Sequence, residues 1–264
     1  MTDSTSSARS GFVEGPQGPL FFDDGGAGGT PVLLVHSAAG STTQWAAQFA
    51  HLRGTRRAVA LDVRGHGRSG PPRDSSYAMA GMAADLVSVA DSLGIRRFVL
   101  VAHSLGAAVA IAAAAQAPGR VAGLLLLDPT SDARTMPREA AAGLLAALRS
   151  DAWQRTAEAH WLAQLEGARP EVTAAVLSDL RATRREALTG AFEALLSFDP
   201  VTPLRAFRGP RLSVITHLND RPDALHALVP GLPVDRIEGT SHWLQLDAPE
   251  AVNAVLDRFL GSIP

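Results

Sequence analysis

The chain lacks cysteine, and it lacks any long hydrophobic run. Among its 264 residues there is no cysteine, which excludes a thiolate nucleophile, a Cys-ligated metal and an iron–sulfur site. The longest apolar stretch, Leu105–Ala115, is mostly alanine and is too short to span a bilayer. The 24 basic residues nearly balance the 26 acidic ones. The sequence therefore predicts no nucleic-acid partner and no membrane partner.

The N-terminus does not contain the apolar core of a signal peptide. We therefore expect a cytoplasmic location, and we interpret residues 1–10 as a polar tail. Hydrophobic residues make up 46% of the chain, which is typical of a folded globular protein and argues against wholesale disorder.

Short continuous apolar runs alternate with helical patterns along most of the chain. Such runs suit parallel strands that are buried on both faces. They occur, after an N-terminal hairpin, at Pro31–Val35, Ala58–Leu61, Phe98–Ala102, Val121–Leu127, Leu212–Ile215 and Val234–Ile237. Helical patterns occur at Thr42–Leu52, Ala78–Leu93, Leu105–Ala117, Pro222–Leu228 and Pro249–Leu260. This alternation predicts an α/β fold with a mostly parallel sheet.

One segment interrupts the alternation. Between Pro129 and Phe207 the pattern predicts only helices. They fall at Pro137–Arg149, Asp151–Leu165, Pro170–Arg181 and Arg184–Leu196. We therefore expect a core of residues 1–128 and 208–264 and an inserted helical cap of residues 129–207 over the strand ends.

The strongest local signal for chemistry surrounds Ser104. A buried strand ends at Ala102, and a helix rich in alanine begins immediately after the serine. This is the context of a nucleophile elbow, a tight strand-to-helix turn that exposes a serine hydroxyl. A serine needs a base to take its proton. His242, in a loop after the last strand, follows Ser104 in the required chain order and is the candidate base. We expect His160, among other histidines, to be structural or on the surface.

Four motifs in order carry a resemblance to the α/β-hydrolase superfamily. They are His36–Gly40, Asp62–Ser69, Ala102–Gly106 and Gly239–Trp243. The chain is similar to esterases and lipase-like serine hydrolases with a helical cap over nearly its whole length. One departure is Ser37, where the family usually has glycine. The resemblance implies an oxyanion hole formed by the backbone N–H groups of Ala38 and Leu105.

Two residues compete for the role of the triad acid, which orients the imidazole. Asp128 ends one predicted strand, and Asp220 lies four residues beyond another. The interval from Asp220 to His242 is short, and His217 replaces the glycine that usually opens that turn. These observations favour Asp128, but the sequence leaves both open.

The expected activity is hydrolysis of carboxylic esters through an acyl-enzyme on Ser104, with no cofactor and no metal. We expect a small apolar ester as substrate. The expected substrate pocket includes Ser37, His103, Trp153, Trp161 and Trp243. The alternatives are a lactonase or carbon–carbon bond hydrolase with the same triad, and a non-hydrolytic ligand-binding member of the fold. Neither the particular ester nor the oligomeric state follows from the sequence.

Overall fold

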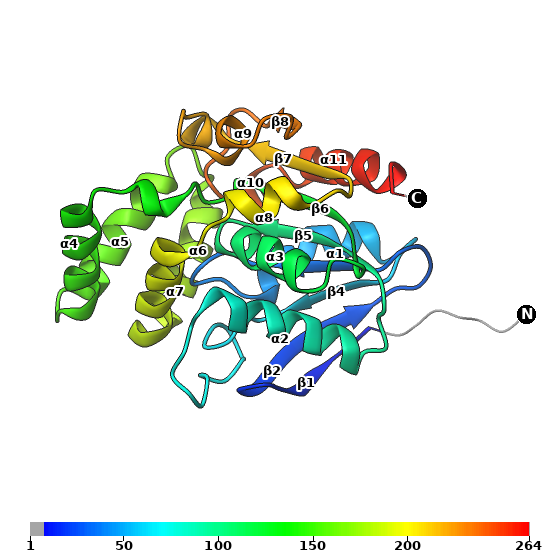
Figure 1. Ribbon diagram of the computed structural model, residues 1–264, viewed down its shortest axis with the longest axis horizontal. Helices are drawn as coiled ribbons and strands as arrows, with labels where there is room; N and C mark the ends of the chain where they lie inside the picture. The colour runs from blue at the N-terminus through cyan, green and yellow to red at the C-terminus, as the bar shows by residue number, and fades with distance from the viewer. Residues whose placement is uncertain (1–7, 264) are drawn as a thin grey trace, which may run out of the picture.

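The computed structural model describes residues 8–263, and these form one eight-stranded, mostly parallel sheet flanked by helices (Figure 1). The strand order is β1-β2-β4-β3-β5-β6-β7-β8. Only the β1–β2 and β2–β4 pairs are antiparallel. The strands are β1 (Arg9–Gly15), β2 (Gly18–Gly25), β3 (Val32–Val35), β4 (Ala58–Leu61), β5 (Phe98–His103), β6 (Val121–Leu127), β7 (Arg211–Ile215) and β8 (Val234–Arg236). The expected fold class is confirmed.

The helices of the core cover both faces of this sheet (Figure 1). They are α1 (Ala46–Leu52), α2 (Met79–Ser92), α3 (Leu105–Gln116), α8 (Val201–Ala206), α9 (Leu225–Leu228), α10 (Leu244–Asp247) and α11 (Pro249–Gly261). Short 3-10 turns lie at η1 (Thr42–Trp45), η2 (Ala133–Thr135) and η3 (His217–Asn219). The predicted helix at Thr42–Leu52 is therefore a 3-10 turn followed by α1.

The central strands are apolar throughout because both of their faces are covered. In β3, Leu33 and Val35 belong to the apolar cluster that includes α2 and α3. Val32 and Leu34 belong to a second cluster with α1 and α11. Successive side chains of a strand point to opposite faces, so one continuous apolar run fills two cores.

The helical cap lies between β6 and β7 and projects beyond the carboxyl ends of the strands (Figure 1). It consists of α4 (Arg138–Arg149), α5 (Trp153–Gln164), α6 (Pro170–Ala182) and α7 (Arg185–Ser197). Buried cap residues such as Trp161 and Val176 join the same apolar cluster as α2 and α3. Helix α8 falls inside the predicted cap range but packs against α3; the limits 129 and 207 remain predictions.

The end of the predicted tail, residues 1–10, overlaps the first strand. Residues 1–7 of the predicted tail lie outside the described residues, whereas Arg9 and Ser10 already belong to β1 and pair with Asp24 and Asp23 of β2. Among residues 8–263, no helix has the length and apolar character needed to cross a membrane.

Candidate active site

Ser104 occupies a strained turn between β5 and α3. Its φ of 54° and ψ of −117° are unusual for a residue with a side chain. Its backbone N–H donates to the Leu127 carbonyl at 3.1 Å, which holds the turn against β6. A Cβ added at Gly106 would lie 2.4 Å from the Val35 carbonyl oxygen, so only glycine fits where α3 starts. Strain that persists in such a well-packed turn marks a functional position.

Asp128 and His242 are in direct contact. The His242 Nδ1 lies 2.6 Å from Asp128 Oδ2. Asp128 also accepts the Thr216 backbone N–H at 2.8 Å and its hydroxyl at 3.1 Å. Burial alone would raise the pKa of Asp128, but the hydrogen bonds and charge of His242, together with Thr216, outweigh it and leave the pKa lowered. The carboxylate is therefore ionised and accepts the Nδ1–H, which leaves His242 Nε2 free to accept a proton.

Asp220, the other candidate acid, lies elsewhere. Its carboxylate pairs with Arg236 Nε at 2.9 Å and faces His226 Nε2 at 3.4 Å. Its side chain is 44% exposed. The structure therefore brings Asp128, and not Asp220, to His242. Asp220 fixes the loop after β7 instead.

The backbone of His242 is held from two sides. Its N–H donates to the Gln164 carbonyl at the end of α5, at 3.0 Å. Its carbonyl oxygen lies 2.8 Å from His103 Nε2, and the other nitrogen of His103 faces the Gln245 amide at 3.2 Å. The expectation that His103 lines the substrate pocket is wrong, because its ring points away from the turn and is completely buried. Burial and the neighbouring charge of His242 hold the pKa of His103 well below its usual value, so the ring is neutral.

The loop after β3 is fixed by His36. Its Nε2 accepts the Val63 backbone N–H at 2.9 Å, and its Nδ1 lies 2.7 Å from the Ser37 carbonyl oxygen. The Ser37 hydroxyl donates to Gln44 Oε1 at 3.3 Å, and the Gln44 amide reaches Asp179 of α6 at 3.2 Å. Within residues 8–263, the backbone N–H groups of Ala38 and Leu105 donate no hydrogen bond. Both therefore remain available to an oxygen of a bound molecule.

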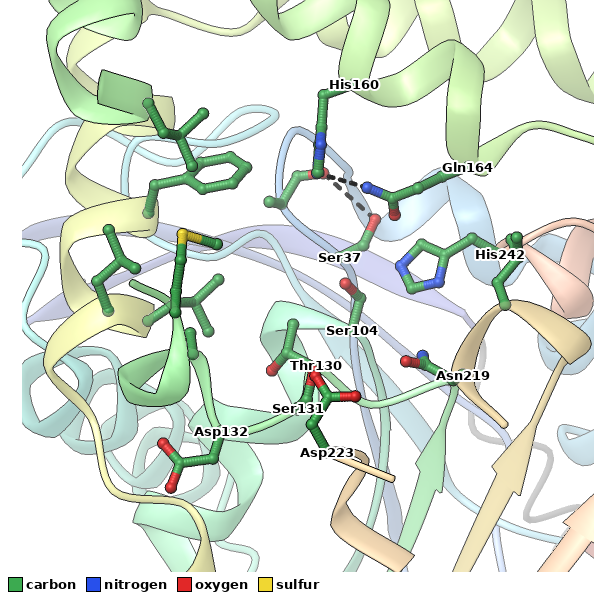
Figure 2. Close-up of a pocket in the computed structure, with 18 of the residues that line it drawn as sticks. Ser37, Ser104, Thr130, Ser131, Asp132, His160, Gln164, Asn219, Asp223 and His242 are labelled. Atoms are coloured by element: carbon green, nitrogen blue, oxygen red, sulfur yellow. Dashed lines mark hydrogen bonds between the residues drawn. The ribbon is translucent and has the colours of Figure 1, made fainter. Parts of the chain in front are cut away.

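A cavity of about 590 Å³ lies between the strand ends and the cap. Figure 2 shows Ser104 and His242 at its base, with the His242 ring turned toward Ser104. Of the expected pocket residues, Ser37, Trp161 and Trp243 line this cavity. Trp153 does not line the cavity. The expectation for Trp153 is therefore wrong, because Trp153 begins α5, and the other end of this helix, at Gln164, is the end that contacts His242.

Several polar lining residues escaped the sequence analysis. His160, expected to be structural or on the surface, lines the cavity, as do Gln164 and Asn219. Figure 2 shows His160 and Gln164 above Ser37 and Asn219 below His242. On a helix, residues three and four apart share a face. His160 and Gln164 are four residues apart, and Trp161 is three residues before Gln164. This spacing was the sequence signal that could have placed them together on the face of the helix that lines the cavity.

Among residues 8–263, no group of three or more His, Asp or Glu side chains is arranged to hold a metal ion. The chemistry available at the site is thus that of a buried serine, an imidazole with a free nitrogen, an ionised carboxylate and two unpaired N–H groups. Such a set matches a serine nucleophile with its base and orienting acid.

Comparison with known proteins identifies the class. Residues 30–204 match the family model for the alpha/beta hydrolase fold, and the chain belongs to this family. Its structure is similar to that of a thermophilic esterase from Thermogutta terrifontis, with a TM-score of 0.81, 25% identity, and coverage of 96% of this chain and 98% of that one. It also resembles a hydrolase from Pseudomonas aeruginosa, with a TM-score of 0.83, 26% identity and coverage of 96% and 99%.

One curated relative is similar over a shorter stretch. A putative carbamate hydrolase, RutD, of Variovorax paradoxus is 40% identical over 115 residues, which is 43% of each chain. The chain thus matches less than half the length of this relative. The resemblance to the superfamily that the four motifs predicted is confirmed, and the two similar structures are those of an esterase and a hydrolase.

Proposed function

We propose that the protein is a serine hydrolase of carboxylic esters. The observation that carries this proposal is the contact of His242 Nδ1 with Asp128 Oδ2, at 2.6 Å, in a cavity that also exposes Ser104. The ionised Asp128 stabilises the imidazolium that forms during the reaction and keeps Nε2 directed at the serine.

In the first half-reaction, the Ser104 hydroxyl oxygen attacks the ester carbonyl carbon and its proton passes to His242 Nε2. The carbonyl oxygen becomes an oxyanion, which the N–H groups of Ala38 and Leu105 stabilise. The bond to the alcohol oxygen then breaks, and His242 returns its proton to the leaving alkoxide. The alcohol departs and the acyl group stays on Ser104.

In the second half-reaction, water attacks the acyl carbon and gives a proton to His242 Nε2. The tetrahedral intermediate collapses, the Ser104 oxygen takes the proton back from His242, and the free acid leaves. The same groups would open a lactone, which is an internal ester. Similarity to the Thermogutta terrifontis esterase supports the choice of esters.

A fluorophosphonate probe tests this proposal directly, because it reacts only with an activated serine. We expect one probe molecule per chain at neutral pH, located on Ser104 by peptide mass spectrometry. Ser104→Ala removes the nucleophile and is the first control. Ser37→Ala, which removes another hydroxyl that lines the cavity, leaves the labelled residue unchanged. If Ser104 stays unmodified while the folded protein remains intact, the protein is not a serine hydrolase.

A further inference from the structure

We propose that the preferred substrate is an ester whose acyl part is apolar and whose alcohol part carries hydrogen-bonding groups. This inference rests on the proposed function and specifies the substrate class for the same cavity. It also differs from the sequence-based expectation of a small apolar ester. The two sides of the cavity are built by different elements and differ in chemistry.

One side of the cavity is mostly apolar. Most of the lining here consists of apolar side chains from the η2–α4 segment and from α7. They are Met136, Leu144, Phe192, Leu195 and Leu196. Asp132, the residue that caps η2, also lines the cavity, but its carboxylate is paired with Arg134 at 2.7 Å. Apolar contacts of this kind gain free energy in proportion to the area that a ligand removes from water. This side therefore fits a hydrocarbon chain or ring.

The other side, next to His242, carries polar groups from α5. The Gln164 carbonyl accepts the His242 backbone N–H at 3.0 Å, so the end of α5 adjoins the candidate base. Gln164 Nε2 lies 2.5 Å from His160 Nε2. Within the described residues, the Gln164 side-chain oxygen and His160 Nδ1 make no hydrogen bond with the protein, although both residues line the cavity. They are available to a ligand.

His160 offers a neutral ring to that ligand. His160 is exposed as a whole residue, but the part of its ring that packs on the cap is shielded from water, which lowers its pKa, and the charge of His242 lowers it further. The ring lies among aromatic side chains, with its centroid 5.6 Å from both Trp161 and Phe192. These contacts fix its orientation. A neutral imidazole hydrogen-bonds hydroxyl, carbonyl and amide groups without requiring an anionic partner.

Asn219 of η3 adds a third polar group next to His242, below it in Figure 2 where His160 and Gln164 lie above. It is 7% exposed, and its Nδ2 donates to the Pro129 carbonyl at 3.2 Å. Its side-chain oxygen accepts no hydrogen bond from any described residue, although Asn219 lines the cavity. A donor on the bound substrate would satisfy this oxygen.

The chemistry of the reaction decides which end of the ester meets which side. His242 must hand its proton to the leaving oxygen, so the alcohol part lies beside His242 when the acyl part is attached to Ser104. The side beside His242 is the one with His160, Gln164 and Asn219. The polar groups consequently face the alcohol part, and the apolar side takes the acyl part.

Two esters of equal length test this inference. Ethylene glycol monohexanoate and propyl hexanoate share the acyl chain and differ by a hydroxyl in place of a methyl group in the alcohol. One hydrogen bond retained in the transition state is worth a kcat/KM ratio of about fivefold. We expect the wild-type protein to prefer the hydroxyl ester by about that factor.

The variants Gln164→Met and His160→Phe keep side-chain size but remove the polar groups, and each should abolish the preference. Gln154→Met, an exposed change on the same helix, is the matched control and should keep it. Equal rates, or a preference of the wild type for the propyl ester, would overturn the inference and leave the proposed function intact. If neither ester is hydrolysed and Ser104 is not labelled by the fluorophosphonate, the proposed function fails, and the inference fails with it.

Discussion

The two walls of the cavity have different origins. The core wall comes from loops at the strand ends and carries Ser37, Ser104, Asn219 and His242. The cap wall comes from helices α4, α5 and α7. In the core wall, each reactive group is fixed by several short contacts, such as the 2.6 Å contact of His242 with Asp128. In the cap wall, packing of apolar side chains dominates. The core wall thus holds the reactive groups in place, and the cap wall provides the surface that selects the substrate.

The largest effect should come from the acid of the core wall. Asp128→Asn removes the charge that holds the Nδ1–H tautomer of His242, and kcat for a p-nitrophenyl ester should fall about 10⁴-fold. Asp220→Asn changes an equally ionisable residue on a neighbouring loop that pairs only with Arg236 and His226. We expect nearly wild-type turnover in that variant. Comparable losses in the two variants would contradict the assignment of Asp128.

The two carboxylates also show what the sequence can reveal. Ser104 and His242 are recognisable because strand, turn and helix surround them locally. Asp128 and Asp220 both follow strand ends, and only the tertiary structure shows that Thr216 and His242 converge on Asp128. A sequence does not contain that distance.

The same limit applies to the histidines. His103 neighbours Ser104 in the sequence but lies on the opposite side of the turn, where it contacts the His242 backbone. His160 lies on a helix whose apolar periodicity is equally typical of a buried core. The alternation of strands and helices, in contrast, depends only on side-chain periodicity, and for that reason the fold was predictable to within a few residues at most element ends.

The core beneath the core wall should be sensitive to acid because it buries His66, in the loop after β4, away from the cavity. Burial, with help from the nearby His36, lowers the pKa of His66 to about 4. In the unfolded chain this residue binds a proton near its ordinary pKa, whereas the folded state keeps it neutral. The free energy of unfolding is therefore highest above about pH 6.5. It decreases as the pH drops from about 6.5 to about 4, by up to about 3 kcal/mol for this one group.

Urea unfolding at several pH values measures this loss. His66→Gln should flatten the decline in the free energy of unfolding over that interval. His51→Gln is the matched control, because His51 lies on the surface beside Asp257, and it should leave the decline as in the wild type. An unchanged slope in His66→Gln would mean that other groups cause the acid sensitivity.

In the cap wall, we expect moderate effects that depend on the substrate. Phe192→Leu reduces the apolar surface on the acyl side of the cavity and should lower kcat/KM for a p-nitrophenyl hexanoate by about tenfold, with a smaller loss for the acetate. Trp153→Leu is the matched control, since Trp153 packs against the core and outside the cavity. It should leave the ratio of the two rates unchanged. Identical ratios in both variants would argue against a selective role for the cap wall.

The smallest effect concerns the strain in the core wall. Ser104 has a φ of 54°, a conformation that glycine adopts at little cost but a residue with a Cβ does not. Ser104→Gly should therefore raise the free energy of unfolding by about 1 kcal/mol, after allowance for the extra freedom of glycine in the unfolded chain. Ser104→Ala keeps the Cβ and should show no such gain. Ser197→Gly, at the end of helix α7 in the cap, should instead lower stability by about 0.5 kcal/mol, because no strain is relieved there. If only Ser104→Gly raises the free energy of unfolding, the nucleophile turn stores strain that the cap does not. If both glycine variants lower it equally, the unusual backbone angles of Ser104 do not destabilise the fold.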